Sequence, residues 1–162
     1  MSEAPGPPGF ESDELLTWSG LATVLEWLPA LLDAQLQRDA DLTHFEFGVL
    51  FALENAPDRT LRMSVLAGYA NSSLSRLSRA ASRLESRGWT RREPDPADGR
   101  FTVAILTEQG LEQYERATPA HVDNVHRLVL DVLTRPQRQQ LREITRRVLR
   151  AVRENGEWPG AR

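Results

Sequence analysis

The segment Ser73–Arg100, SLSRLSRAASRLESRGWTRREPDPADGR, holds seven of the twenty arginines of a 162-residue chain whose formal net charge is −3. At about 100° per residue in an α-helix, its first half has two faces. The positions that we predict to be buried share one face: Leu74, Leu77, Ala81 and Leu84. The arginines of the nearly opposite face are Arg76, Arg79, Arg83 and Arg87. The segment therefore predicts an amphipathic helix over residues 73–87 with an arginine-rich outer face.

The residues before this helix predict a shorter helix and a tight turn. Apolar periodicity over residues 63–69 predicts the short helix. In the break at residues 70–72, Asn71 or Ser72 is expected to cap the arginine-rich helix.

The residues after it predict a β-hairpin. Gly88 ends the helix, and apolar and polar residues then alternate over 89–93 and 101–106. The turn formers of residues 94–99 join these two strands. A short helix, a turn, a basic helix and a hairpin, in this order, are typical of a winged helix-turn-helix.

The N-terminal part of the chain predicts two more helices. A three-and-four apolar spacing predicts a long helix over residues 13–39, which Pro29 should kink or split. Thr43 and Glu46 have the spacing of a capping box at the start of the next helix.

The C-terminal part predicts helices as well. Thr107 caps a helix that should bend near Pro119, and residues 134–136 begin the last helix. The expected fold class is therefore mainly α with a small β-hairpin wing: a winged helix-turn-helix lobe plus a helical region.

Charge is distributed unevenly along the chain. Residues 1–60 contain eleven carboxylates and two arginines, whereas residues 61–100 contain eight arginines and four carboxylates. An arginine-rich helix face is often an ordinary solvated surface, but such faces normally carry acidic partners four residues away. Glu85 is the only carboxylate between Asn71 and Arg92, against six arginines. This imbalance favours binding of a polyanion, with arginines reaching guanine edges or phosphates.

Other classes of protein receive little support. The chain has no cysteine, so disulfides and thiolate metal sites are excluded. We expect no cofactor, metal site or catalytic group, since His121 and His126 are five residues apart and no nucleophile or phosphate-binding motif is present. No apolar run approaches the roughly twenty residues of a membrane span, and the opening residues lack a secretory pattern, so we expect a cytoplasmic protein that is not an enzyme and binds no membrane.

Three segments together resemble the MarR family of winged-helix transcriptional regulators, in its actinobacterial type. They are LTHFEFGVL (residues 42–50), LAGYANSSLSRLSRAASRLESRGWTRRE (residues 66–93) and DPADGRFTVAILTEQG (residues 95–110). The resemblance implies a homodimer whose first and last two helices interleave and whose lobes bind a palindromic operator in double-stranded DNA. Two recognition helices would then lie about one DNA turn apart, roughly 34 Å.

The candidate DNA contacts follow from the helix, the wing and the resemblance. The resemblance assigns groove contacts to five residues of the turn and helix: Ser72, Ser73, Ser75, Arg76 and Arg79. It assigns a wing-tip pair to Asp98 and Arg100, and an arginine at a hairpin tip fits an adjacent minor groove. Arg83, on the helix, and Arg91, at the base of the wing, complete the predicted surface.

A ligand site is a further expectation. Family members often respond to small aromatic or phenolic anions bound between the dimer helices and the winged lobe. The residues that can line such a cavity are Trp18, Trp27, His44, Phe45 and Phe51. Aromatic residues at helical spacing can equally be core or interface residues, and no ligand motif decides between the two.

The predicted organisation is a tail over residues 1–12, a dimerisation helix over 13–41, the DNA-binding lobe over 42–106, dimerisation helices over 107–153 and a tail over 154–162. The function expected is a sequence-specific DNA-binding regulator of transcription, a ligand-responsive repressor. Two alternatives remain open: a winged-helix module that binds another protein, and an architectural DNA-binding protein without operator specificity.

Overall fold

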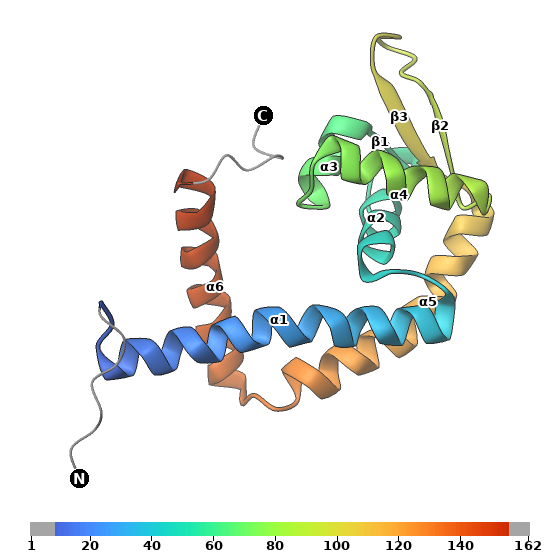
Figure 1. The fold of residues 1–162 in the computed structure, drawn as a ribbon. Helices are drawn as coiled ribbons and strands as arrows, with labels where there is room; N and C mark the ends of the chain where they lie inside the picture. The colour runs from blue at the N-terminus through green and yellow to red at the C-terminus, as the bar shows by residue number, and fades with distance from the viewer. Residues whose placement is uncertain (1–8, 156–162) are drawn as a thin grey trace.

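The computed structural model describes residues 9–155. Its elements, in chain order, are α1 (Ser12–Ala40), α2 (His44–Glu54), η1 (Pro57–Arg59), β1 (Thr60–Arg62), α3 (Met63–Tyr69), α4 (Leu74–Ser86), β2 (Thr90–Pro94), β3 (Thr102–Leu106), α5 (Glu108–Val125), η2 (His126–Leu130) and α6 (Arg135–Asn155). Helices dominate and the β2–β3 hairpin projects from the lobe (Figure 1), which confirms the predicted fold class. The predicted tails fall largely outside the described residues, at 1–8 and 156–162.

The sheet has one strand more than the sequence predicted. All three strands pair antiparallel in the order β1-β3-β2. β1 is only three residues long, and Leu61 and Arg62 pair with Ala104 and Val103 of β3. Three residues are too few to show a recognisable alternation. β1 fastens the root of the hairpin to the lobe.

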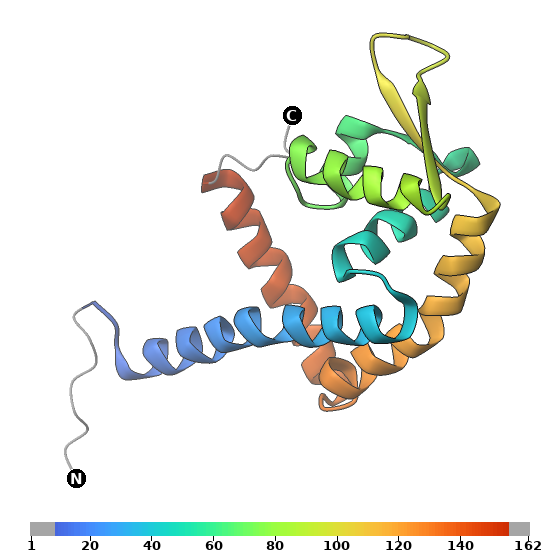
Figure 2. The ribbon, with the colours of Figure 1, turned by 45° about the vertical axis from the view of Figure 1, so that its right-hand side comes forward.

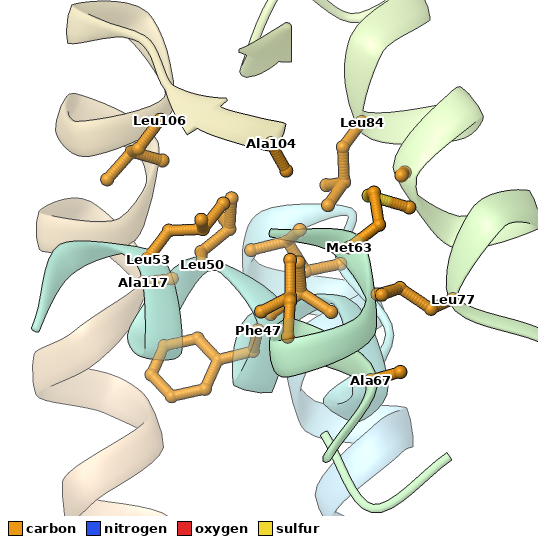
Figure 3. Close-up of a cluster of buried hydrophobic side chains, with 14 of the residues drawn as sticks. Phe47, Leu50, Leu53, Met63, Ala67, Leu77, Leu84, Ala104, Leu106 and Ala117 are labelled. Atoms are coloured by element: carbon orange, nitrogen blue, oxygen red, sulfur yellow. The ribbon is translucent and has the colours of Figure 1, made fainter. Parts of the chain in front are cut away.

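The core lies where α2, α3 and α4 meet β3 and the first turns of α5 (Figure 3). Leu50, Leu53, Leu77 and Leu84 are completely buried in it. Leu74 was predicted to be buried, but it is 53% exposed. Ala80 is buried instead, because the buried positions of α4 begin at Leu77, one turn after Leu74 at the start of the helix.

Three helix caps were predicted from the sequence; Thr107 caps α5 as predicted, and the cap of α4 was placed wrongly. Thr43 and Glu46 form the predicted capping box of α2. The cap of α4 is Ser73, whose Oγ accepts a hydrogen bond from the Arg76 amide. An N-cap requires an extended backbone, which Ser73 has, whereas Asn71 has a φ of 48° and makes the tight turn.

α1 is one continuous helix of 29 residues that passes through Pro29 (Figures 1 and 2). Of the two predicted effects of Pro29, a kink or a split, the split is therefore wrong. By length and composition α1 could also cross a membrane, with a mean hydropathy of 1.4 over an 18-residue window, contrary to the sequence expectation. A single such helix is weak evidence of a membrane protein, because other apolar helices pass the same test.

The C-terminal helices continue from the lobe. α5 contains Pro119, changes direction along its length and runs beside α1. It ends in the π-helical turn η2. α6 then stands apart from the lobe in both views, and its apolar residues, such as Ile144 at 56%, are exposed. The exposed apolar residues of α1 include Leu16, Leu25 and Trp27.

Gly110 provides a test of how α5 joins the hairpin. A Cβ at Gly110 would overlap the Trp89 carbonyl oxygen and lie 2.8 Å from Leu106 Cδ1. We expect Gly110→Ala to lower the free energy of unfolding by about 1 to 3 kcal/mol through overpacking. Gly48→Ala is the matched control, because a Cβ there meets nothing within 4 Å; the better helix propensity of alanine should raise stability by about 1 kcal/mol. Urea denaturation of both variants measures the difference, and equal effects would contradict the close approach.

Candidate nucleic-acid interface

The outermost face of α4 is not the one that the arginine pattern indicated. Opposite the buried face, at about 100° per residue, lie Ser75, Arg79, Ser82 and Ser86, all exposed. Within residues 9–155, Arg79 has no ion pair. α4 therefore presents short hydroxyl side chains around one free guanidinium group.

Arg83 lies on one flank of α4 and reaches back into the lobe. Its Nε donates a hydrogen bond of 2.7 Å to Glu46, whose side chain is 3% exposed. The other Glu46 oxygen accepts from the Thr43 amide at 2.9 Å. Burial raises the pKa of the Glu46 carboxyl, but the hydrogen bonds from Thr43 and Arg83 outweigh it and hold the pKa below its usual value. Arg83 thus fastens α4 to the start of α2.

Two more arginines of the same flank approach the α1–α2 junction. Arg87 pairs with the Asp41 carboxylate at 3.2 Å and also bonds to its carbonyl oxygen. The Arg76 guanidinium lies over the Phe45 ring, 4.4 Å from its centroid. The sequence shows no acidic partners for these arginines at positions four residues away, and the structure instead pairs Arg83 and Arg87 with carboxylates of other elements.

The other flank of α4 faces the wing. Arg92 of β2 donates to Glu85 at 2.7 Å, to Ser82 at 3.0 Å and to Ser78 at 3.5 Å. The hydrogen bonds that Arg92 donates to Glu85 hold the pKa of the Glu85 carboxyl below its usual value. Sequence analysis assigned no function to Arg92; its position three residues into the strand after α4 was the only available signal. Arg91, on the opposite side of the strand, is exposed and pairs with Glu93.

The wing tip has the predicted pair. Arg100 Nη2 donates to one Asp98 oxygen at 2.6 Å and its Nε donates to the other at 2.9 Å. Hydrogen bonds from the Arg100 side chain and backbone lower the pKa of the Asp98 carboxyl. The Arg100 side chain is nevertheless 84% exposed. The pair presents an oriented guanidinium group to solvent.

The three serines that were predicted to contact DNA differ in their exposure and in their hydrogen bonds. Ser72 is buried, and its hydroxyl bonds to the Ser73 carbonyl oxygen, so it is removed from the surface. Ser73 is occupied as the cap of α4 but lies 3.2 Å from the Ser75 hydroxyl. Ser75 itself is exposed. Of the five groove contacts that the resemblance assigned, Ser75, Arg76 and Arg79 are therefore the exposed ones.

The five predicted ligand residues do not share one site. His44, Phe45 and Phe51 line a cavity of about 400 Å³ between α2 and α3. Trp18 and Trp27, on α1, are 50% and 66% exposed and do not line this cavity. These two tryptophans belong to an unpaired helix face, which periodicity alone did not distinguish from a cavity wall.

A second hollow, of about 810 Å³, lies between α1, α2 and α4. Its lining combines the α4 flank with the α1–α2 junction: Pro29, Asp33, His44, Phe45, Arg76, Arg79 and Arg83. Phe45 and His44 also line the first cavity. An apolar ring beside three guanidinium groups suits an aromatic anion.

His44, which lines this hollow, contacts a second histidine, His121. The rings of His44 and His121 are 5.5 Å apart, and His121 Nδ1 lies 3.2 Å from Gln35 Oε1. Burial lowers the pKa of both, with nearby Asp33 opposing the shift at His44 and His44 adding to it at His121. No group of three or more potential metal ligands is found in the part of the chain that the structure describes.

A family model described as MarR family matches residues 40–100. Sco3205, a MarR family transcriptional regulator from Streptomyces coelicolor solved in complex with DNA, is 42% identical, with a TM-score of 0.90 over 94% of this chain and 99% of that one. AbsC, a MarR family transcriptional regulator from the same organism, is 30% identical, with a TM-score of 0.87 over 92% of this chain and all of that one.

A curated relative is the transcriptional repressor MprA of Escherichia coli (strain K12), which is 32% identical over 103 residues. The match covers 64% of this chain and 58% of MprA. The chain therefore spans less than two thirds of the length of that relative.

Proposed function

Because this chain belongs to the MarR family, we propose that it is a homodimeric regulator of transcription that binds a palindromic operator in double-stranded DNA. The observation that carries the proposal is the outward face of α4, where Ser75, Ser82 and Arg79 lie exposed beside a wing that ends in Arg100. A helix fits the major groove, and serine and arginine side chains reach base edges and phosphates there.

The contacts that we propose for each arginine follow from the partners it has in the free protein. Arg79 is free of ion pairs among the described residues and Arg76 is held only by a ring, so these two are proposed to contact bases. Arg83 and Arg91 are already paired and are proposed to contact phosphates. Arg100 is proposed to enter the adjacent minor groove, where negative potential attracts a guanidinium group.

The homodimer is proposed from the exposed apolar faces of α1 and α6. Leu16, Leu25 and Trp27 on α1, and Ile144 and Val148 on α6, are all more than 40% exposed. Exposed apolar side chains along two helices favour association with another protein surface. A two-fold dimer would place two lobes on a palindrome. It would also cover the apolar side of α1, which favours a cytoplasmic protein over a membrane protein.

A repressor is proposed by similarity to MprA, which is named as a transcriptional repressor. Binding at a promoter would exclude polymerase, and no catalytic step is proposed. The alternatives are a module that binds another protein and an architectural protein without operator specificity.

The first test is recovery of fragmented DNA from the organism's own genome at two salt concentrations. We expect enrichment of a palindrome with half-sites about one turn apart and a steep loss of binding at higher salt, because phosphate contacts release counterions. Uniform, salt-sensitive recovery would favour the architectural alternative. No recovery at either salt concentration would favour the protein-binding module.

A second test separates base contacts from phosphate contacts. Arg79→Ala and Arg76→Ala should each weaken operator binding by about 1 to 3 kcal/mol and relax the choice of one base per half-site. Arg91→Ala is the control and should weaken binding to operator and random DNA alike, with a salt slope reduced by about 1. Equal losses on both DNAs for Arg79→Ala would make Arg79 a phosphate contact.

A small aromatic or phenolic anion is proposed as effector in the hollow between α1, α2 and α4. A carboxylate bound there would compete with DNA for Arg76 and Arg79, and its ring would contact Phe45. Binding would therefore oppose operator binding directly.

A thermal-shift series of benzoate and hydroxybenzoates tests this site, with cyclohexanecarboxylate as the non-aromatic control. We expect a rise in Tm and release of operator DNA for the aromatic acids, and a loss of both effects in Phe45→Leu. The absence of a Tm shift together with unchanged DNA binding would exclude this class of effector.

A further inference from the structure

We propose that Arg62 of β1 is a positioning residue that sets the reach of the wing tip into DNA. The inference rests on the proposed DNA-binding function, but the bracing itself is a property of the free protein. Sequence analysis gave Arg62 no role, because it precedes α3 and lies more than thirty residues before the wing tip. Only the three-stranded sheet brings it there.

Arg62 lies where the hairpin leaves the sheet. It is the last residue of β1 and pairs with Val103 of β3, whose other neighbour is Glu93 of β2. Beyond this step the β2–β3 hairpin has no third strand, as the projecting hairpin of Figure 1 shows. A two-stranded ribbon is marginally stable alone, so the tip depends on contacts that reach past the end of β1.

The Arg62 side chain makes such a contact. Its Nε forms an ion pair with Asp95, whose side chain is only 8% exposed. Asp95 is the first residue after β2. A carboxylate at that depth requires a partner, and Arg62 supplies it from the body of the lobe.

Asp95 in turn organises the tip. Its second oxygen accepts from the Ala97 amide at 2.8 Å, and its backbone bonds to the Phe101 carbonyl oxygen at 2.9 Å and to the Asp98 amide at 3.2 Å. The bonds from Ala97 and Arg62 hold the pKa of the Asp95 carboxyl below its usual value. Asp95 therefore both closes the turn of the wing and forms the ion pair with Arg62.

The brace also reaches the pair at the tip. The Arg62 guanidinium lies 4.6 Å from the centroid of the Phe101 ring, and the Arg100 guanidinium lies 6.0 Å from it. The positive charge of Arg62 also lowers the pKa of the Asp98 carboxyl that holds Arg100. Through Asp95, Phe101 and Asp98, the position of Arg62 is coupled to that of Arg100.

Without Arg62 the turn keeps its own backbone bonds, but the hairpin loses its tie to β1. Arg92 still fixes the base of β2 to α4, so the change is confined to the outer part of the wing. The expected consequence is a mobile Arg100 that no longer discriminates by the width of the minor groove, while major-groove binding by α4 persists.

The experiment uses the full chain in two measurements. Amide hydrogen exchange of the free protein tests the brace, and binding to two duplexes tests its use. The duplexes share one operator core and differ in AT-rich or GC-rich flanks, since a narrow AT-rich minor groove attracts arginine. Arg62→Met combined with Asp95→Asn is the main variant, because it leaves no unpaired buried charge; Arg62→Lys retains the charge.

The matched control is Arg59→Ala, which removes an arginine beside the same strand. Arg59 pairs with Glu54 and Glu108 and not with the wing. We expect the double variant to exchange faster only at residues 95–101 and to lose its preference for AT-rich flanks by roughly five- to tenfold, with binding to the GC-rich duplex nearly unchanged. Arg62→Lys should recover part of both effects, and Arg59→Ala should change neither.

Two results would overturn the inference. Unchanged exchange over residues 95–101 would show that Arg62 does not brace the wing. Faster exchange with an unchanged flank preference would show that the brace does not position Arg100 on DNA. If the wild-type protein bound neither duplex, the proposed function would fail, while the exchange data would still decide the brace.

Discussion

The arrangement of the lobe depends on the hydrogen bonds of one buried carboxylate, that of Glu46. A charge at this depth is tolerated only when it is fully paired, and Glu46 uses one oxygen for the Thr43 amide and the other for Arg83. The start of α2 and the flank of α4 are therefore fixed together. Since α4 carries the outward serine and arginine face, its orientation relative to α1 and the wing follows from this pairing.

The same logic divides the arginines of a chain with a net negative charge. Arg83 and Arg87 connect α4 to the α1–α2 junction, and Arg62 and Arg92 connect the wing to β1 and α4. These four arginines connect structural elements of the lobe and the wing. Arg79 is the arginine of the outer α4 face, which means that a simple count of arginines overstates how many are available to DNA.

Features that depend on residues close together in the sequence were predicted well. The helices, the hairpin, the Thr43 cap and the Asp98–Arg100 pair all arise within a few residues and were found as predicted. Contacts between distant segments were not predictable in the same way. The Arg62–Asp95 pair joins residues 33 positions apart, and β1 pairs with residues of β3 that lie still further along the chain; only the folded sheet brings them together.

The candidate site showed the same limit. Trp18, Trp27 and Phe51 have similar helical spacing, yet of the three only Phe51 lines the cavity between α2 and α3, because both tryptophans lie on α1 with half or more of their surface exposed. α1 also contributes to the second hollow. The hollow beside Arg76 and Arg79 is walled on one side by α1, through Pro29 and Asp33. Any partner that covers the apolar face of α1 would therefore contact the helix that forms one wall of the hollow, so the proposed dimer interface and the proposed effector site share α1.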